Sequence, residues 1–228
     1  VLPLRLQSAL AQSESTQPES VQSETDASDS DQPESEESES AESVETLVRA
    51  GLDAYQSGDY ETAADAWRQL IEIVPDSPDI HNNLGATLYQ MGDLEGSAAA
   101  YRQAIALDPD SPTIYNNLGV VLALQEDFEG AIAAYRQALE IDPNVAEVHN
   151  NLGNLLSGEE AVAAYQRAVE INPDYAQAYN NLGTALADLE QYEASIAAYE
   201  QALAINPDFA AAQENLSVVQ ALLEATQE

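Results

Sequence analysis

Four copies of the tetrapeptide Asn-Asn-Leu-Gly recur along the chain, and their spacing constrains the fold more than any other feature. They begin at Asn82, Asn116, Asn150 and Asn180, so successive copies start 34, 34 and 30 residues apart. A divergent copy, Glu-Asn-Leu-Ser, begins 34 residues later at Glu214. A period of about 34 residues is typical of helical hairpins that stack into a solenoid. The spacing therefore predicts an all-α fold.

Prolines follow the same spacing, at Pro75, Pro109, Pro143, Pro173 and Pro207. Because proline lacks a backbone N–H and its ring clashes with the preceding turn, each is expected to end a helix. Ser77-Pro78 and Ser111-Pro112 match an N-cap serine followed by proline at the first helical position. A second break, such as Gly92-Asp93, falls between successive prolines. Each unit is therefore predicted to contain a first helix, a tight turn, a second helix and a proline turn.

The residues inside the units resemble the tetratricopeptide repeat family. That family has Leu-Gly in the first helix, then a small residue, an aromatic and another small residue in the second helix, then proline. The third unit supplies Leu118, Gly119, Ala131, Tyr135, Ala138 and Pro143 in this order. The resemblance covers residues 44–228. It implies a right-handed superhelix whose first helices line a concave groove.

The resemblance divides the chain into five units and a last helix. The units are 44–77, 78–111, 112–145, 146–175 and 176–209, which together span 44–209, and residues 210–228 form the last helix. We expect that helix to be a cap, because each hairpin of a solenoid buries its apolar face only on its neighbours.

The fourth unit, 146–175, is shorter than the others. Gly153 and Ala161 are 8 residues apart, whereas Gly119 and Ala131 in the third unit are 12 apart. About one helical turn is therefore missing between its two helices. Ser157 and the glutamate three residues later predict a capping box at the start of the second helix. The deletion is either simply tolerated or changes the groove locally.

The N-terminal part differs in composition from the repeats. Residues 1–11 end in Ala-Leu-Ala, the small-x-small pattern that precedes a signal-peptidase cut, and are interpreted as the end of a signal peptide or as an ordinary disordered start. Residues 12–43 are rich in Ser, Glu, Asp, Gln and Pro. They contain too few apolar residues to offset the entropy of ordering, so a disordered acidic linker is predicted. This organisation favours a periplasmic or secreted protein over a cytoplasmic one.

The charge of the chain restricts its partners. It has 41 acidic residues and 6 Arg or Lys, a net charge of −35. Nucleic acids and anionic membrane surfaces would be repelled, and no apolar stretch is long enough to cross a membrane. Basic or extended polypeptides are the expected partners. Because a body this acidic repels itself at low ionic strength, we also expect its melting temperature to rise with salt.

No residue pattern predicts catalysis or a cofactor. The chain has no Cys, which excludes thiol chemistry, and its two histidines, His81 and His149, share a repeat position with Tyr115 and Tyr179. A position shared by His and Tyr indicates packing rather than a catalytic base or a metal ligand. The sequence therefore predicts no enzyme activity, no metal and no cofactor.

The paired asparagines carry the functional prediction. In the family, the residue before Leu-Gly points into the groove, so these asparagines are expected to form a ladder there that binds a peptide backbone. The ladder resembles that of the repeat domain of O-linked N-acetylglucosamine transferases. The predicted groove residues are Asn83, Asn117, Asn151, Asn181 and Asn215, flanked by Asn82, Asn116, Asn150, Asn180, Tyr89 and Asn154. The alternative is that the amides only satisfy helix ends or neighbouring hairpins.

The sequence thus predicts a non-enzymatic scaffold that binds an extended polypeptide through the asparagine ladder. Two other roles remain open at this point. The chain could self-associate through its convex face or its capping helix. It could also be an accessory subunit of a separately encoded enzyme, such as a glycosyltransferase. The oligomeric state is not predicted.

Overall fold

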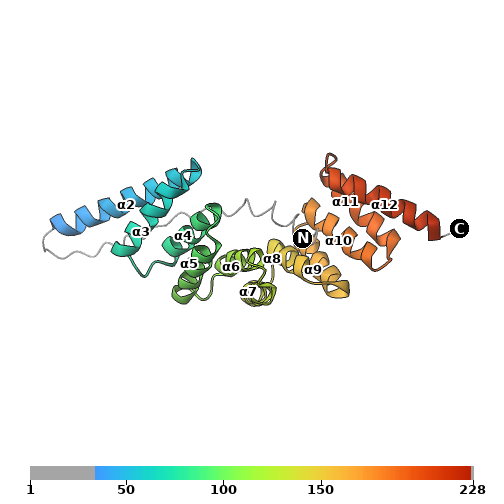
Figure 1. Cartoon of the computed structure of the whole chain (residues 1–228), viewed down its shortest axis with the longest axis horizontal. Helices are drawn as coiled ribbons and strands as arrows, with labels where there is room; N and C mark the ends of the chain where they lie inside the picture. The colour runs from blue at the N-terminus through green and yellow to red at the C-terminus, as the bar shows by residue number, and fades with distance from the viewer. Residues whose placement is uncertain (1–33, 227–228) are drawn as a thin grey trace. The chain divides into compact units, whose positions relative to one another are not determined.

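The computed structural model describes residues 34–226, with side chains from Ser43 onward, and within this range the chain forms eleven α-helices and no β-strand. The helices are α2 (Glu34–Gln56), α3 (Tyr60–Ile73), α4 (Pro78–Gln90), α5 (Leu94–Leu107), α6 (Pro112–Leu124), α7 (Phe128–Ile141), α8 (Ala146–Leu155), α9 (Gly158–Ile171), α10 (Ala176–Asp188), α11 (Tyr192–Ile205) and α12 (Ala210–Thr226). Figure 1 colours them from blue at α2 to red at α12. The predicted all-α hairpin fold is confirmed.

The predicted signal-peptide end and most of the predicted linker lie outside the described residues. Residues 34–43 differ from the prediction, because they form the first part of α2 instead of linker. Glutamate, frequent in this stretch, is a good helix former. The helix continues into Val44, Leu47 and Val48, which pack against the core beside α3. Burial of this apolar face favours a helix that begins before the predicted boundary at residue 44.

The helices divide into two compact units, and the division falls in the sequence of α7, between Ala131 and Ile132. In the N-terminal unit, α2 pairs with α3 and α4 with α5, while α3 packs on α4 and α5 on α6. Trp67 and Leu70 of α3 are fully buried and pack with Ile80 and Leu84 of α4. The core therefore lies between successive hairpins as well as within them, as expected for a solenoid.

The C-terminal unit repeats this arrangement. Helix α8 pairs with α9 and α10 with α11, while α9 packs on α10 and α11 on α12. Tyr165 of α9 packs in one cluster with Leu182 of α10, and Tyr199 of α11 packs in the next with Ala212 and Val219 of α12. These are the two residues that α12 buries, so this last helix covers α11 with one face only.

The Leu-Gly pairs allow the two helices of a hairpin to approach closely. A Cβ atom added at Gly85, Gly153 or Gly183 would lie 2.7 Å from a tyrosine ring of the second helix. The rings belong to Tyr101, Tyr165 and Tyr199, each nearly fully buried. This explains why the glycine of the first helix and the aromatic of the second helix occur together in the sequence.

The helix starts confirm the predicted N-cap positions but not the predicted capping side chains. Ser77 and Ser111 occupy N-cap positions before proline as predicted, but neither side chain makes a capping hydrogen bond. Side-chain capping occurs at the second helices of the first two hairpins. Asp59 and Asp93 accept hydrogen bonds from backbone N–H groups at the start of α3 and α5. Asp108 accepts a hydrogen bond from the backbone N–H of residue 110, as expected for a turn-forming residue.

In the shortened hairpin, the first helix is the shorter one. Helix α8 has 10 residues, whereas α4, α6 and α10 have 13 each, and α9 keeps the 14 residues of the other second helices. Ser157 occupies the predicted N-cap position of α9, but the predicted capping box is wrong, since its side chain makes no capping hydrogen bond. Gly158 begins α9 with φ at +59°, a left-handed conformation in place of the helical geometry that the first residue of a capped helix adopts.

Candidate functional site

The residues predicted to line a groove are mostly enclosed by neighbouring side chains. Eight of them are no more than 7% exposed: Asn82, Asn83, Asn116, Asn117, Asn150, Asn154, Asn180 and Asn181. Asn151, Asn215 and Tyr89 are half-buried. This arrangement differs from the open wall of amides that the sequence suggested. Peptide contact by these residues stays a prediction.

In the N-terminal unit, the amides join successive repeats. Asn117 Nδ2 on α6 donates to Asn82 Oδ1 on α4 across 3.2 Å. A second buried link runs from Trp67 Nε1 to Thr87 Oγ1, 3.0 Å away. Thr87 Oγ1 in turn donates to the backbone carbonyl of Asn83. Helices α3, α4 and α6 are therefore connected by buried polar contacts in addition to apolar packing.

In the C-terminal unit, the amides form a continuous network. Asn215 Nδ2 on α12 donates to Asn180 Oδ1 on α10 across 3.1 Å, and Asn180 Nδ2 lies 3.5 Å from Asn181 Oδ1. Asn181 Nδ2 then donates to two oxygens of α8, Asn150 Oδ1 at 3.0 Å and Asn154 Oδ1 at 3.2 Å. The network therefore connects α12, α10 and α8.

A common rule relates these contacts to the sequence. The second asparagine of one repeat donates to the first asparagine of the preceding repeat, as in Asn117 to Asn82, Asn181 to Asn150 and Asn215 to Asn180. The alternative considered from the sequence, that the amides satisfy neighbouring hairpins, thus describes part of what they do. The signal for it was the pairing itself, because a single groove ladder needs only one asparagine per repeat.

Within the described residues, two donors of this network have no partner. Asn150 Nδ2 and Asn154 Nδ2 are buried and have no hydrogen-bond acceptor. Asn154 Oδ1, in contrast, also accepts from the Tyr165 hydroxyl at 2.9 Å. A buried donor without an acceptor costs about 1–3 kcal/mol. The shortened hairpin therefore contains two buried amide nitrogens that no side chain or backbone acceptor satisfies.

The two histidines have a structural role. His149 Nε2 lies 2.9 Å from the carbonyl oxygen of Pro143, and His81 Nε2 lies 3.0 Å from that of Pro75. Because a carbonyl only accepts, each ring must carry a hydrogen on Nε2. Gln213 donates in the same way to the carbonyl of Pro207. The position therefore supports the proline turn, which agrees with the packing role that the sequence predicted.

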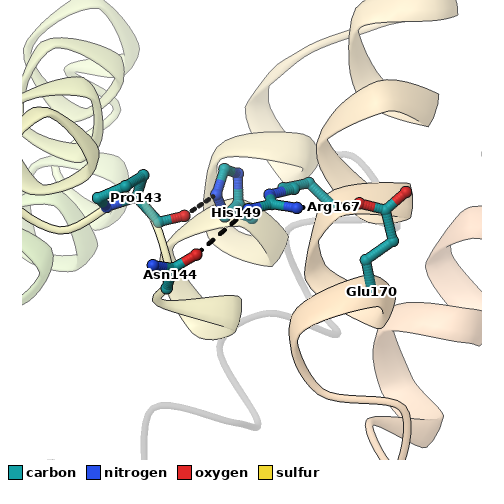
Figure 2. Close-up of polar contacts among 5 residues, drawn as sticks. All are labelled: Pro143, Asn144, His149, Arg167 and Glu170. Atoms are coloured by element: carbon teal, nitrogen blue, oxygen red, sulfur yellow. Dashed lines mark hydrogen bonds and ion pairs between the residues drawn. The ribbon is translucent and has the colours of Figure 1, made fainter.

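The proline turn of the shortened hairpin has a further support. Figure 2 shows Arg167 of α9 reaching back to this turn beside His149. Arg167 Nη2 donates to Asn144 Oδ1 at 3.2 Å, and Nη1 pairs with Glu170 at 3.1 Å. Both contacts are solvent-exposed, so each contributes little to stability by itself. Together they orient the turn that leads into α8.

Burial also raises the pKa values of two tyrosines. It raises the pKa of Tyr101, whose phenol is enclosed in the second hairpin. Burial, with a smaller contribution from Glu147, raises the pKa of Tyr175 to about 12. Both phenols therefore stay neutral near pH 7 and act as hydrophobic or hydrogen-bonding groups rather than as acids.

Neither a metal site nor a membrane-spanning helix is found among the described residues. In residues 43–226, no three His, Asp or Glu side chains are grouped closely enough to hold a metal ion. None of the helices between Glu34 and Thr226 combines the length and hydropathy that a membrane crossing requires. The amide network is thus the candidate site that the structure offers.

Sequence profiles of known families match most of the repeats. A profile described as TPR repeat matches residues 51–92, 87–126, 122–158 and 159–189, and one described as Tetratricopeptide repeat matches residues 176–209. Together they run without a gap from residue 51 to residue 209, which is more than half of the chain. No curated protein matches the sequence.

Solved structures share the fold. PilF of Pseudomonas aeruginosa is 19% identical, with a TM-score of 0.68 over 82% of this chain and 93% of its own. YrrB, described as a TPR protein with an unusual peptide-binding site, is 19% identical, with a TM-score of 0.63 over 77% of this chain and 96% of its own. An O-GlcNAc transferase of Thermobaculum terrenum is 25% identical, with a TM-score of 0.53 over 57% of this chain but only 26% of its own. The resemblances predicted from the sequence are confirmed.

Proposed function

The chain belongs to the tetratricopeptide repeat family, and on this premise we propose that it is a non-enzymatic scaffold that binds an extended polypeptide along the first helices of its hairpins. The observation that carries the proposal is the amide network, which places side chains of one chemistry on α4, α6, α8, α10 and α12. YrrB, a protein of similar fold, is described as having a peptide-binding site.

The chemistry of an amide suits this role. An asparagine nitrogen carries two hydrogens and its oxygen can accept two hydrogen bonds. A contact between two repeats uses only part of this capacity, so an amide such as that of Asn215 can hold its neighbour and still bind a ligand. The repeat contacts also fix the side-chain orientation, which lowers the entropy that binding would cost. A peptide backbone offers the matching N–H and C=O groups in a regular series.

The negative charge of the chain favours some polypeptide ligands over others. The chain has no Lys, and Arg68, Arg102 and Arg136 are exposed on second helices, away from the amides. A ligand that depends on its terminal carboxylate or on acidic side chains would therefore meet few cations. A basic polypeptide, in contrast, would be attracted by the net charge of −35 and would associate faster at low salt.

The test is a selection of 12-residue peptides displayed on phage, followed by binding measurements with the chosen peptides. Replacing the half-buried Asn151 and Asn215 together by Ala should weaken binding by about 10-fold or more, since each lost hydrogen bond contributes roughly 0.5–1.5 kcal/mol. Gln103→Ala, on the exposed face of α5, is the matched control and should bind like the wild type. Equal affinity of all three proteins would contradict the proposal.

One observation favours a second candidate role, self-association. Helix α12 leaves Val218 55% and Leu222 45% exposed, one turn apart. A second copy could cover them, although the net charge of −35 opposes such contact at low salt. Light scattering at low and high salt separates the two roles. Oligomers that disappear when both residues are changed to Ser would support self-association.

A further inference from the structure

Two tyrosine rings meet at the turn of the first hairpin. Tyr55, near the end of α2, and Tyr60, the first residue of α3, have ring centroids 5.4 Å apart and ring planes inclined at 67°. Both side chains are half-buried, so solvent reaches part of each residue. The pair therefore presents aromatic surface at one end of the first hairpin, apart from the buried amides.

The hairpin fold does not require aromatic residues at both positions. The second, third and fifth repeats have Tyr89, Ala123 and Ala187 at the position of Tyr55, and Leu94, Phe128 and Tyr192 at that of Tyr60. Among these four repeats, the first alone combines two aromatics. Tyr55 also packs against the core of the first hairpin, but alanine serves at this position in later repeats. The ring pair is therefore an addition that is particular to the first repeat.

The inclination of the two rings suits a positive group. The face of an aromatic ring carries a negative potential and its edge a positive one. In an edge-to-face pair, the ring that directs its edge at the other keeps both of its own faces clear of its partner. A cation in the angle between the rings can lie over a face of each, within the distance of about 6 Å at which a ring attracts it. A neutral apolar group would gain no such attraction.

The charges around the pair also favour a cation. Exposed carboxylates stand within two residues of the tyrosines, at Asp53, Asp59 and Glu61. The nearest arginines along the chain are Arg49 and Arg68, and each is already paired with an acidic residue of its own helix. A positive group from outside therefore meets a negative potential and little competition from the cations of the chain.

A third tyrosine adjoins the pair. Tyr89 of α4 occupies the repeat position of Tyr55 and is also half-buried. The pKa of the buried Tyr101 is raised mainly by burial, with smaller electrostatic contributions from Tyr55 and Tyr89. Both phenols therefore lie near the same buried group. Because a phenol oxygen accepts hydrogen bonds, Tyr89 adds an acceptor beside the two ring faces.

We propose that Tyr55 and Tyr60, with Tyr89 beside them, form a subsite for the ammonium group of a lysine side chain. An ammonium is compact and can contact both rings at once, whereas a planar guanidinium stacks on a single face. The carbon stem of lysine can cover the remaining apolar surface of the rings. That the lysine belongs to a bound polypeptide rests on the proposed function. The subsite would hold the positive charge of this ligand at the first hairpin.

The first experiment needs no peptide. Tetramethylammonium chloride is titrated into the full chain at constant ionic strength, while NMR follows the ring protons of Tyr55 and Tyr60. Both rings should shift at least 2-fold more than with tert-butanol, a neutral molecule of similar shape. Tyr60→Leu, which introduces the residue of the second repeat, should reduce the shift at Tyr55 at least 2-fold.

Tyr192→Leu is the matched control, because it makes the same change in the fifth hairpin, where Ala187 provides no second ring. It should leave the shift at Tyr55 unchanged. Equal shifts with tetramethylammonium and tert-butanol, or equal shifts in Tyr60→Leu and the wild type, would overturn the proposal even if the chain binds peptides elsewhere.

The second experiment tests lysine within a bound peptide. Each lysine of the phage-selected peptides is replaced in turn by norleucine, which keeps the carbon chain and removes the charge. One replacement should weaken binding to the wild type at least 5-fold and binding to Tyr60→Leu less than 2-fold. A general attraction by the acidic chain would be lost equally in both proteins, so only the difference reports the subsite.

Tyr60→Leu should unfold close to the wild-type urea midpoint, because leucine fills the same position in the second repeat. Norleucine replacements that weaken binding to both proteins equally would contradict the subsite while leaving the scaffold role standing. Selected peptides without lysine would count against it in the same way.

Discussion

The fourth and fifth hairpins carry the same tetrapeptide and differ, among other positions, in two respects that bear on the amides. Helix α8 of the fourth has 10 residues and α10 of the fifth has 13, and Asn154 replaces Thr184 after the glycine. Their tyrosines are equally buried against glycine, and their second helices have equal length. The comparison teaches that the glycine–tyrosine contact sets the hairpin, whereas the helix end and the residue after glycine are free to vary.

The largest expected effect tests the shared part of the two hairpins. Tyr165→Ala should lower the free energy of unfolding by about 3–5 kcal/mol, because it empties a fully buried ring position beside Gly153. Tyr199→Ala should cost a similar amount in the fifth hairpin. Urea unfolding followed by circular dichroism measures both.

Tyr165→Phe is the control for this pair. It keeps the ring and removes the hydroxyl with its bond to Asn154, so about 1 kcal/mol should be lost. A Tyr165→Ala variant that is no less stable than Tyr165→Phe would show that the shortened hairpin does not depend on this contact.

The next prediction concerns an asparagine introduced in the fifth hairpin at position 184, which corresponds to Asn154 of the fourth. Thr184→Asn should lower the free energy of unfolding by about 1 kcal/mol, since Thr184 Oγ1 donates to the carbonyl of Asn180 and the substitution disturbs this hydrogen bond at a half-buried position. Thr184→Val, which removes the oxygen that Tyr199 uses, separates this cost from the loss of that hydrogen bond. If Thr184→Asn unfolds at the wild-type midpoint, an amide is tolerated at this position in either hairpin. The unpaired amide nitrogens of α8 would then not distinguish the fourth hairpin from the fifth.

A smaller effect concerns the turns between the helices. Glu190 precedes α11 with φ at +59°, where the first two hairpins use Gly58 and Gly92 at +79°. Left-handed geometry costs a residue with a side chain about 1–2 kcal/mol, and part of this is offset by the flexibility of glycine in the unfolded chain. Glu190→Gly should therefore stabilise the protein by about 0.5–1 kcal/mol in urea unfolding. Glu200→Gly, in the interior of α11, should destabilise it by a similar amount.

The sequence predicted the parts of the structure that depend on residues close together in the chain. Leu-Gly, the aromatic and the proline define each hairpin, because each acts within one unit. The partners of the amides were not predictable, since Asn181 reaches Asn150 across 31 positions and the contact exists only once hairpins stack. The capping box failed for a local reason, because Gly158 adopts a left-handed φ of +59°, which glycine permits but does not require. Sequence thus located the candidate residues but not their contacts.

The last prediction concerns the contact between the fourth and fifth hairpins. Burial, and to a lesser degree Glu147 of α8, raises the pKa of Tyr175 at the start of α10 from 10.0 to about 12. Because the raised value belongs to the folded state, the neutral phenol supports folding fully below pH 10, and this support is lost as the pH rises toward 12. Tyr175→Phe should therefore lose less stability than the wild type between pH 10 and pH 12 in urea unfolding. Glu147→Gln should reduce the difference only partly, because burial is the larger cause. If wild type and Tyr175→Phe lose stability equally over this range, the phenol is solvated, and the fourth and fifth hairpins are held together by the amide network and apolar packing alone.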